Sequence, residues 1–265
     1  MLGCGGVELK SKRQNKIMKL LLLERTLKTE DLARRFNVSV ETIRRDINAM
    51  ETEKVIKKVY GGIELVPDSR RITEMAAWDA RLEHCHEEKV AIAARALEYI
   101  PDGSTVALDI GTTTYELSAL LGTKKDLTII TNSLRVATNM AQNTDHTVYC
   151  IGGLMTRVEI VAGGMAARDF LNNFAAIDLY MCSTDGITIE NGMTEFDEAV
   201  VDVKRRLIQM SDRVISLVDH SKFGKRALFP TCALKDLDLL ITDDKVGKDY
   251  LEQLSKAKVP VVIAE

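Results

Sequence analysis

The chain of 265 residues has few cysteines and no long apolar run. Its five cysteines are scattered, odd in number and without a CxxC pair, which argues against a disulfide or zinc framework and fits a reducing cytoplasm. No apolar segment approaches the ~20 residues that cross a bilayer. We therefore expect a soluble, cytoplasmic protein.

One cluster of metal-ligand residue types stands out, the run His84-Cys85-His86. Adjacent residues on a helix point in different directions, so a single ion cannot easily use all three side chains. The sequence therefore predicts no metal site and no cofactor.

Excess positive charge is also missing, because the chain has a formal net charge of −3 and a pI of about 5.9. The charge is unevenly spread, however. Residues 1–66 contain 14 Lys and Arg against 9 Asp and Glu, a net +5, whereas the remainder has 22 against 30, a net −8. Because contact with nucleic acid phosphates is local, this asymmetry indicates a DNA-binding function at the N-terminal end.

Residues 28–50, KTEDLARRFNVSVETIRRDINAM, have the pattern of two short helices joined by a tight turn. Thr29 is a candidate N-cap for a helix that ends at Phe36, and Asn37 tolerates a left-handed turn conformation. Ser39 is the candidate cap of the second helix. The apolar residues of that second helix recur at helical spacing and predict one buried face: Val40, Ile43, Ile47 and Met50.

The opposite face of the second helix carries the residues that suit a DNA major groove. Ser39, Thr42, Arg44 and Arg45 are expected to reach bases or phosphates, since arginine contacts both. An ordinary amphipathic helix pair with a solvated charged face is the alternative. The segment that follows favours DNA binding: residues 54–63 alternate apolar and basic residues and include Gly61-Gly62, which predicts a hairpin wing that displays Lys57, Lys58 and Tyr60. Helical spacing over residues 13–23 adds a third helix.

From residue 87 onward, helical and strand patterns alternate, which predicts parallel crossover units and an α/β fold with helices on both faces of the sheet. We expect helices at residues 87–100, 113–121, 133–142, 166–174 and 198–210. We expect strands at residues 104–110, 127–131, 147–151, 179–183, 213–219, 237–242 and 259–264.

Polar residues follow the expected strands, and ligands of parallel sheets bind at the carboxyl ends of the strands. Asp109-Ile110-Gly111-Thr112-Thr113-Thr114 combines a turn, three hydroxyls and a helix N-terminus, which suits a phosphate. A capped turn with no ligand is the equal alternative. Lys222 is expected to neutralise the phosphate, and Asp109 or Asp219 to accept hydrogen bonds from sugar hydroxyls. Glu195, Asp197 and Lys204 either close this site or begin a helix.

Head and body together resemble the DeoR/GlpR family of bacterial sugar-metabolism regulators, most of which are repressors. The resemblance rests on segments in the family's order: VSVETIRRDINAME, DGSTVALDIGTTTYELS, TNSLRVA, IGGLMTR, DGITIENGMTEFDEAVVDVKR, LVDHSKFGKRAL and LDLLITDD. It runs from about Arg13 to Asp244. The chain departs from the family at Met181-Cys182-Ser183-Thr184, which replaces a more apolar, glycine-containing strand end.

The resemblance implies a winged helix-turn-helix head, residues 11–66, a connector, residues 67–86, and an effector-sensing α/β body, residues 87–265, similar to the ribose phosphate isomerase fold. It implies double-stranded operator DNA and a phosphorylated sugar or related metabolite as partners, and a homo-oligomer, either dimer or tetramer. The implied effector site comprises Asp109, Gly111, Thr112, Thr113, Thr114, Asn132, Gly153, Asp185, Gly186, Asp219 and Lys222. The implied DNA site is the set of recognition and wing residues named above.

Two functional classes follow from these observations. The chain is a transcriptional regulator of a carbohydrate operon, or it is a sugar phosphate isomerase-like enzyme fused to a DNA-binding head. An enzyme needs a nucleophile or an acid–base pair at the strand ends, and the candidates there, Asp109, Asp185, Asp219 and Lys222, are explained equally well by binding. We expect a regulator with no catalytic residue. This expectation rests on the family resemblance, because a fold alone does not fix a function.

Overall fold

The computed structural model describes residues 12–24, 26–52, 56–65, 78–156 and 161–265. Contacts divide the chain into two compact units, Met1–His84 and Cys85–Glu265, and each is described by itself. Residues 1–10, the expected start of the wing at Lys54 and most of the expected connector lie outside the described residues. Every described helix is too short or too polar to cross a membrane.

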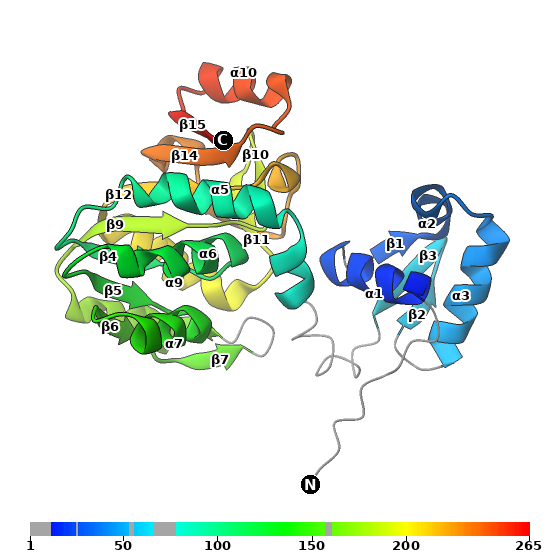
Figure 1. Cartoon of the computed structure of the whole chain (residues 1–265), viewed down its shortest axis with the longest axis horizontal. Helices are drawn as coiled ribbons and strands as arrows, with labels where there is room; N and C mark the ends of the chain where they lie inside the picture. Colours follow the sequence, from blue (N-terminus) through cyan, green and yellow to red (C-terminus); the bar gives the residue numbers. More distant parts are fainter. Residues whose placement is uncertain (1–11, 25, 53–55, 66–77, 157–160) are drawn as a thin grey trace, which may run out of the picture. The chain divides into compact units, whose positions relative to one another are not determined.

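The described residues of the head form three helices and a small antiparallel sheet (Figure 1). The helices are α1 (Lys12–Glu24), α2 (Thr29–Phe36) and α3 (Val40–Thr52). They surround an apolar core in which the predicted face of α3 is buried at Ile43, Ile47 and Met50, while Val40 is half-buried at its edge. Further core side chains come from all the other elements of the head: Ile17, Leu21, Leu27, Leu32, Ala33, Ile56 and Ile63.

The wing is the hairpin β2 (Ile56–Val59) and β3 (Gly62–Leu65), and β3 also pairs with β1 (Thr26–Lys28), which the sequence pattern did not indicate. Gly61 has a left-handed φ of 75°, as the hairpin turn requires. A Cβ on Gly62 would lie 2.2 Å from the carbonyl oxygen of Leu27. Glycine at residue 62 therefore allows β1 to approach the wing.

The turn between α2 and α3 follows the expected chemistry, with one correction. Asn37 adopts the left-handed conformation at φ 51° and ψ 49°. The Ser39 hydroxyl accepts a hydrogen bond from the Thr42 backbone N–H at 3.1 Å, so Ser39 caps α3. Thr29, by contrast, is the first residue of α2 and not its cap, because the backbone N–H of Thr29 donates to the Gly61 carbonyl at 3.1 Å.

The larger unit is built on a seven-stranded parallel sheet with the order β15-β14-β12-β9-β4-β5-β6. All seven strands were predicted from the sequence to within about two residues. They are β4 (Thr105–Leu108), β5 (Thr128–Thr131), β6 (Thr147–Cys150), β9 (Ile177–Cys182), β12 (Ser211–Leu217), β14 (Leu239–Asp243) and β15 (Val261–Ala264).

Helices cover both faces of this sheet, as predicted (Figure 1). Side chains of β4 alternate between two apolar cores: Val106 and Leu108 lie in one, Ala107 in the other. The first core is closed by α5 (His86–Leu97), α6 (Thr112–Leu120) and α7 (Leu134–Asn143). The second is closed by α8 (Gly164–Phe170), α9 (Glu198–Met210) and α10 (Lys248–Lys256).

The crossovers contain short strands and a helix that the sequence pattern did not predict. A three-stranded sheet with the order β10-β11-β13 is formed by Gly186–Thr188, Gly192–Glu195 and Phe229–Cys232, and β7 (Leu154–Thr156) pairs with β8 (Val161–Gly163). Helix α10 was also missed. The helix expected at residues 166–174 is instead α8 followed by a single 3₁₀ turn, Leu171–Asn173. In the described chain, the connection from β12 to β14 contains the strand β13 and no α-helix.

Candidate functional sites at the wing and at the strand ends

The recognition helix α3 presents its polar face to solvent. Arg44 and Arg45 are exposed. The Arg44 guanidinium lies 3.9 Å from the Glu41 carboxylate, which is a long and therefore weak surface ion pair. The hydroxyls of Ser39 and Thr42 lie 2.8 Å apart and engage each other at the start of the helix. Both arginines are thus free to extend from α3.

The two wing lysines lie on opposite sides of β2, since successive side chains of a strand alternate. Lys58 forms an ion pair with Glu51 of α3, whereas Lys57 pairs with its cross-strand neighbour Glu64. A shallow groove of about 340 Å³ separates α3 from the wing, and it is lined in part by Arg44, Asn48, Lys58, Gly61 and Gly62. The structure therefore brings Arg44 and Lys58 together at one groove, and Lys57 is not among its lining residues.

At the tip of the wing, Tyr60 is completely exposed. A fully solvated aromatic side chain makes no contribution to the head's core. Its position, beside the Gly61 turn, makes it available for contact with a partner.

In the larger unit, the end of β4 is fixed by a buried ion cluster. Asp109 is 1% exposed and lies 2.8 Å from the Lys204 ammonium, which also contacts Glu195 at 2.6 Å. Lys204 donates in addition to the Ser183 carbonyl at 2.8 Å, and Asp109 accepts from both the backbone N–H and the hydroxyl of Ser183. The oxygens of Asp109 are therefore already engaged by protein groups.

Burial governs the ionisation of this cluster. It raises the pKa of Glu195 to about 8 and that of Asp109 above its ordinary value, although Lys204 opposes both shifts. Burial alone would lower the pKa of Lys204, but the two carboxylates outweigh it and hold that pKa above its ordinary value. Lys204 is thus charged, and its single ammonium contacts both the Asp109 and the Glu195 carboxylate.

The turn after β4 presents the start of α6. Gly111 has a φ of 151°, and a Cβ there would lie 2.3 Å from the Ser183 hydroxyl, so glycine lets the turn lie against the end of β9. The Thr114 hydroxyl donates back to the carbonyl of Gly111 at 3.0 Å. Within the described residues, the hydroxyls of Thr112 and Thr113 have no hydrogen-bond partner; Thr112 is half-buried and Thr113 is buried. The amides of a first helical turn favour an anion.

Two other expected residues meet at β8. The Asn132 amide donates to the Ala162 carbonyl at 3.1 Å, whereas its buried Oδ1 atom has no partner among the described residues. Gly153 lies against the same strand, because a Cβ there would be 2.8 Å from the Gly163 carbonyl.

The remaining expected residues lie on two loops that contact each other. Asp185 accepts from the Phe196 N–H at 3.0 Å, and Gly186 lies against the Lys225 carbonyl. The Gly224 N–H donates to the Ile187 carbonyl at 2.9 Å, which joins this segment to the Asp219–Gly224 loop.

That loop carries Asp219 and Lys222. Asp219 is 1% exposed, and burial opposes its ionisation. Lys222, Ser221 and Lys89 outweigh that effect and lower the pKa of Asp219 below its ordinary value. Asp219 is thus an anion held beside two cationic side chains.

Sequence reasoning missed two important residues. Ser183 was noted only as a departure from a family pattern, yet it binds Asp109 and abuts Gly111. Lys89 is 2% exposed and occupies the apolar stripe of α5, at the spacing i, i+3, i+4 and i+7 with Ile92, Ala93 and Ala96. A lysine on a buried helical stripe was the available signal.

The head has the fold of a winged helix DNA-binding domain, and the larger unit is an α/β domain built on a parallel sheet. Residues 13–68 match the DeoR-like helix-turn-helix domain, and residues 84–244 match the DeoR C terminal sensor domain. The chain belongs to the DeoR family of transcriptional regulators, as the sequence motifs predicted.

Relatives along nearly the whole chain are regulators. The chain is 33% identical to the HTH-type transcriptional regulator GolR of Listeria innocua, covering 96% of this chain and 98% of that protein. It is 34% identical to the Glycerol-3-phosphate regulon repressor of Escherichia coli, with 88% and 90% covered. The Transcriptional repressor AccR of Agrobacterium fabrum is 32% identical over 87% and 88%. These relatives favour a regulator over the enzyme alternative.

Among solved structures, ribose 5 phosphate isomerase A from Neisseria gonorrhoeae is similar with a TM-score of 0.40 and 19% identity, covering 52% of this chain and 53% of that one. A likeness of this size carries no argument about chemistry.

Replacing Lys204 with methionine should destabilise the larger unit by about 3–5 kcal/mol, because it leaves two buried carboxylates without a cation. Carboxylates whose pKa is raised in the folded state bind protons on folding, so their contribution to stability is present at low pH and is lost as pH rises through the folded pKa. The deficit of Lys204→Met should therefore be larger at pH 8 than at pH 5. Urea unfolding at both pH values measures it.

Lys256→Met is the matched control, since Lys256 is exposed in the last turn of α10. It should change stability by less than about 0.5 kcal/mol. A Lys204→Met protein as stable as this control at pH 8 would show that the cluster contributes no stability.

Proposed function

We propose that this regulator is a repressor of a carbohydrate-utilisation operon, and that a phosphorylated sugar or related metabolite controls its affinity for operator DNA. Two features found in one chain carry the proposal. One is an arginine-bearing recognition helix beside a basic wing. The other is a strand end of the parallel sheet at which α6 begins with three threonines. The names of the relatives support repression, and DNA as the partner implies a cytoplasmic protein.

In this proposal the head reads DNA through α3. Arg44 and Arg45 extend into the major groove, where a guanidinium contacts guanine edges in a bidentate manner. Ser39 and Thr42, at the start of α3, contact the phosphate backbone or base edges. Lys57, Lys58 and Tyr60 of the wing contact the backbone, with Gly61 and Gly62 permitting close approach. The paired glutamates do not prevent this, since exposed ion pairs are worth about 0–1 kcal/mol.

The effector site that we propose lies at the carboxyl ends of β4, β5, β9 and β12. The amides at the start of α6 and the hydroxyls of Thr112 and Thr113 hold the phosphate, and Lys222 neutralises it. Asp109, Gly111 and Thr114 hold the turn that precedes α6 in position. The sugar portion is contacted from the remaining candidates: Asn132, Gly153, Asp185, Gly186 and Asp219. A relative named for a glycerol-3-phosphate regulon is consistent with a phosphate ester as ligand.

Replacing Arg44 or Arg45 with alanine should weaken specific DNA binding by about 1–3 kcal/mol if the arginine reads a base. Lys57→Ala should weaken binding to all duplexes about equally and reduce the salt dependence by roughly one counterion. The binding site is first selected from random duplexes with wild-type protein, and affinities are then measured by fluorescence anisotropy at several salt concentrations. Arg168→Ala, on a half-buried residue of α8 in the larger unit, is the control. Unchanged specific affinity in both arginine variants would show that α3 does not read DNA.

We also propose a homo-oligomer, dimer or tetramer, because a symmetric operator requires two heads related by symmetry. Light scattering at micromolar concentration should give a mass of two or four times 29.5 kDa. A species of 29.5 kDa alone, with full affinity for a palindromic site, would rule out this proposal.

Lys222→Ala should lower the affinity for a sugar phosphate roughly ten- to a hundredfold, because it removes a charge-assisted contact of about 1.5–3 kcal/mol. Binding of DNA without effector should be nearly unchanged. Calorimetric titration with a panel of sugar phosphates, and with inorganic phosphate, measures the first effect, and DNA affinity is measured in parallel. Lys225→Ala is the matched control, since Lys225 is an exposed lysine of the same loop.

Two results would contradict the effector site in different ways. Equal ligand affinity in wild type and Lys222→Ala would remove Lys222 from it. Normal binding by Thr113→Val as well would remove the phosphate cradle at α6, while leaving the DNA-binding proposal intact.

A further inference from the structure

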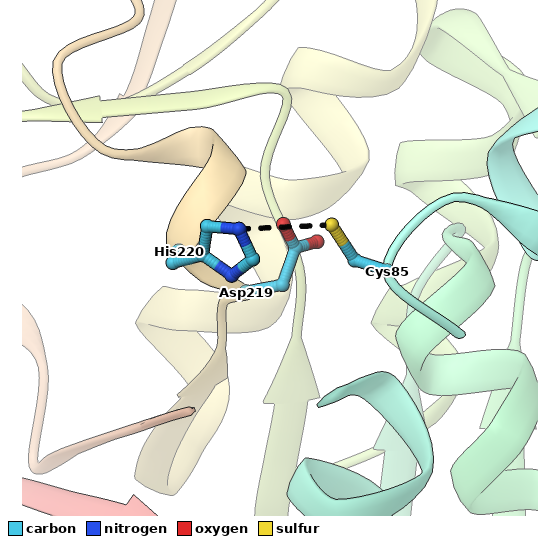
Figure 2. A group of neighbouring side chains, drawn as sticks. All are labelled: Cys85, Asp219 and His220. Carbon is cyan, nitrogen blue, oxygen red and sulfur yellow. Dashed lines mark hydrogen bonds between the residues drawn. The ribbon is translucent and has the colours of Figure 1, made fainter. Parts of the chain in front are cut away.

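Three side chains with different metal-ligating atoms converge at the end of β12. Cys85 precedes α5, and Asp219 and His220 follow β12, so residues about 135 positions apart in the chain meet (Figure 2). The Cys85 thiol sulfur, an Asp219 carboxylate oxygen and a His220 ring nitrogen all lie within 4.8 Å of one another. The sulfur and the His220 Nε2 atom are 4.0 Å apart.

Asp219 supplies a second, independent observation. Its Oδ1 atom accepts a hydrogen bond from the Ser221 N–H at 2.9 Å. Its Oδ2 atom is buried and has no hydrogen-bond partner among the described residues. A buried carboxylate oxygen without a partner is costly, and Figure 2 shows the Asp219 carboxylate directed into the space between His220 and Cys85. A cation bound there would satisfy it.

The imidazole of His220 is already oriented as a ligand. Its Nδ1 atom lies 3.0 Å from Asp243 Oδ1, and its backbone N–H donates to Asp243 Oδ2 at 2.7 Å. Metal-bound histidines are commonly held in this way, by a carboxylate on the ring nitrogen opposite the metal. The other nitrogen, Nε2, is the one that faces the Cys85 sulfur.

We propose that Cys85, Asp219 and His220 bind a divalent zinc ion through one sulfur, one oxygen and one nitrogen atom. This ligand set suits zinc, which accepts all three donor types and is often held by three protein ligands with a fourth position left open. As the zinc–sulfur bond forms, the thiol proton leaves to solvent. In a tetrahedral site the sulfur and nitrogen would be about 3.6 Å apart, from bond lengths of about 2.3 and 2.05 Å. The observed pair must therefore approach by about 0.4 Å, which a small side-chain rotation provides.

The charges around the three ligands permit a cation. Lys222 and Lys89 act on Asp219, and Glu88 acts with Asp219 on Cys85. Lys245 is neutralised by its ion pair with Glu88. Asp243 adds a carboxylate behind His220. With the thiol deprotonated, the negative groups are Cys85, Asp219, Glu88 and Asp243, and the positive groups are Lys222, Lys89 and Lys245. The local charge is therefore about −1, and a divalent ion changes it to about +1.

This site differs from the run of neighbouring residues considered in the sequence. There, His84, Cys85 and His86 were judged as a contiguous trio, which a single ion cannot use. His86 turns instead to Glu116, 3.3 Å away. Only folding brings Cys85 to Asp219 and His220.

Cobalt(II) titration of the full chain, first stripped of metal with a chelator, tests the site. A cobalt–thiolate bond gives an intense ultraviolet charge-transfer band, which should appear with one equivalent of cobalt and disappear when zinc is added. The band should be absent in Cys85→Ser. Asp219→Asn and His220→Ala should weaken zinc binding at least tenfold, and Asp243→Asn roughly 10–100-fold. Circular dichroism verifies that each variant is folded.

Cys150→Ser is the matched control, because Cys150 is an exposed thiol at the end of β6. Its band and zinc affinity should equal those of wild type. No band in wild type, a band that survives in Cys85→Ser, or a band that Cys150→Ser abolishes would each overturn the proposal. The titration contains no sugar phosphate and no DNA, so its result is independent of the effector and operator proposals.

Discussion

The contact on which the strand ends depend is the buried ammonium of Lys204 between Asp109 and Glu195. It joins the end of β4, the end of β9 through the Ser183 carbonyl, and β11, and α9 supplies the lysine. Burying three charged groups is expensive. Lys204 attracts both carboxylates, which repel each other, and Ser183 hydrogen bonds to Asp109 and Lys204. An apolar cluster of the same volume would be at least as stable. What the charged groups add is a fixed geometry, because hydrogen bonds between an ammonium and carboxylates are directional and allow few arrangements of the three side chains.

That geometry determines what the neighbouring turn can do. Ser183 lies against Gly111, so the cluster sets the position at which α6 begins. The Thr114 hydroxyl is used within this turn, whereas no described residue hydrogen bonds to the hydroxyls of Thr112 and Thr113. A preorganised anion site costs less to occupy than one that must be ordered on binding. Asp109, one of the acidic residues expected to be ligands, is thus better understood as a support of this turn.

Sequence alone predicted the features that follow from local periodicity. Residue spacing predicted the buried stripe of α3 and all seven strands of the parallel sheet. The turn preference of asparagine predicted the left-handed conformation of Asn37. Strands β1, β7, β8, β10, β11 and β13 were missed because each is defined by its partner. Their length does not explain it, since β4, β5, β6 and β15 also have only four residues. Two close-approach positions depend on contacts between segments that are distant in sequence: Gly62 lies against Leu27, and Gly111 lies against Ser183. Lys89 could have been found, since it interrupts an apolar stripe, but the partner of a buried lysine cannot be read from its own helix.

Asp219 connects the two ligands that we propose for the larger unit. In the structure it lies in the field of Lys222, which lowers its pKa, and the same attraction holds Lys222 toward Asp219 and away from an anionic ligand. A divalent cation on Asp219 would replace that attraction with repulsion, so Lys222 would be released toward the phosphate while the local charge becomes positive. The two binding events would then favour each other, and by thermodynamic necessity to the same extent in both directions. An anionic effector would in this way be bound most tightly by the metal-loaded protein, through a coupling that requires no movement beyond one lysine side chain.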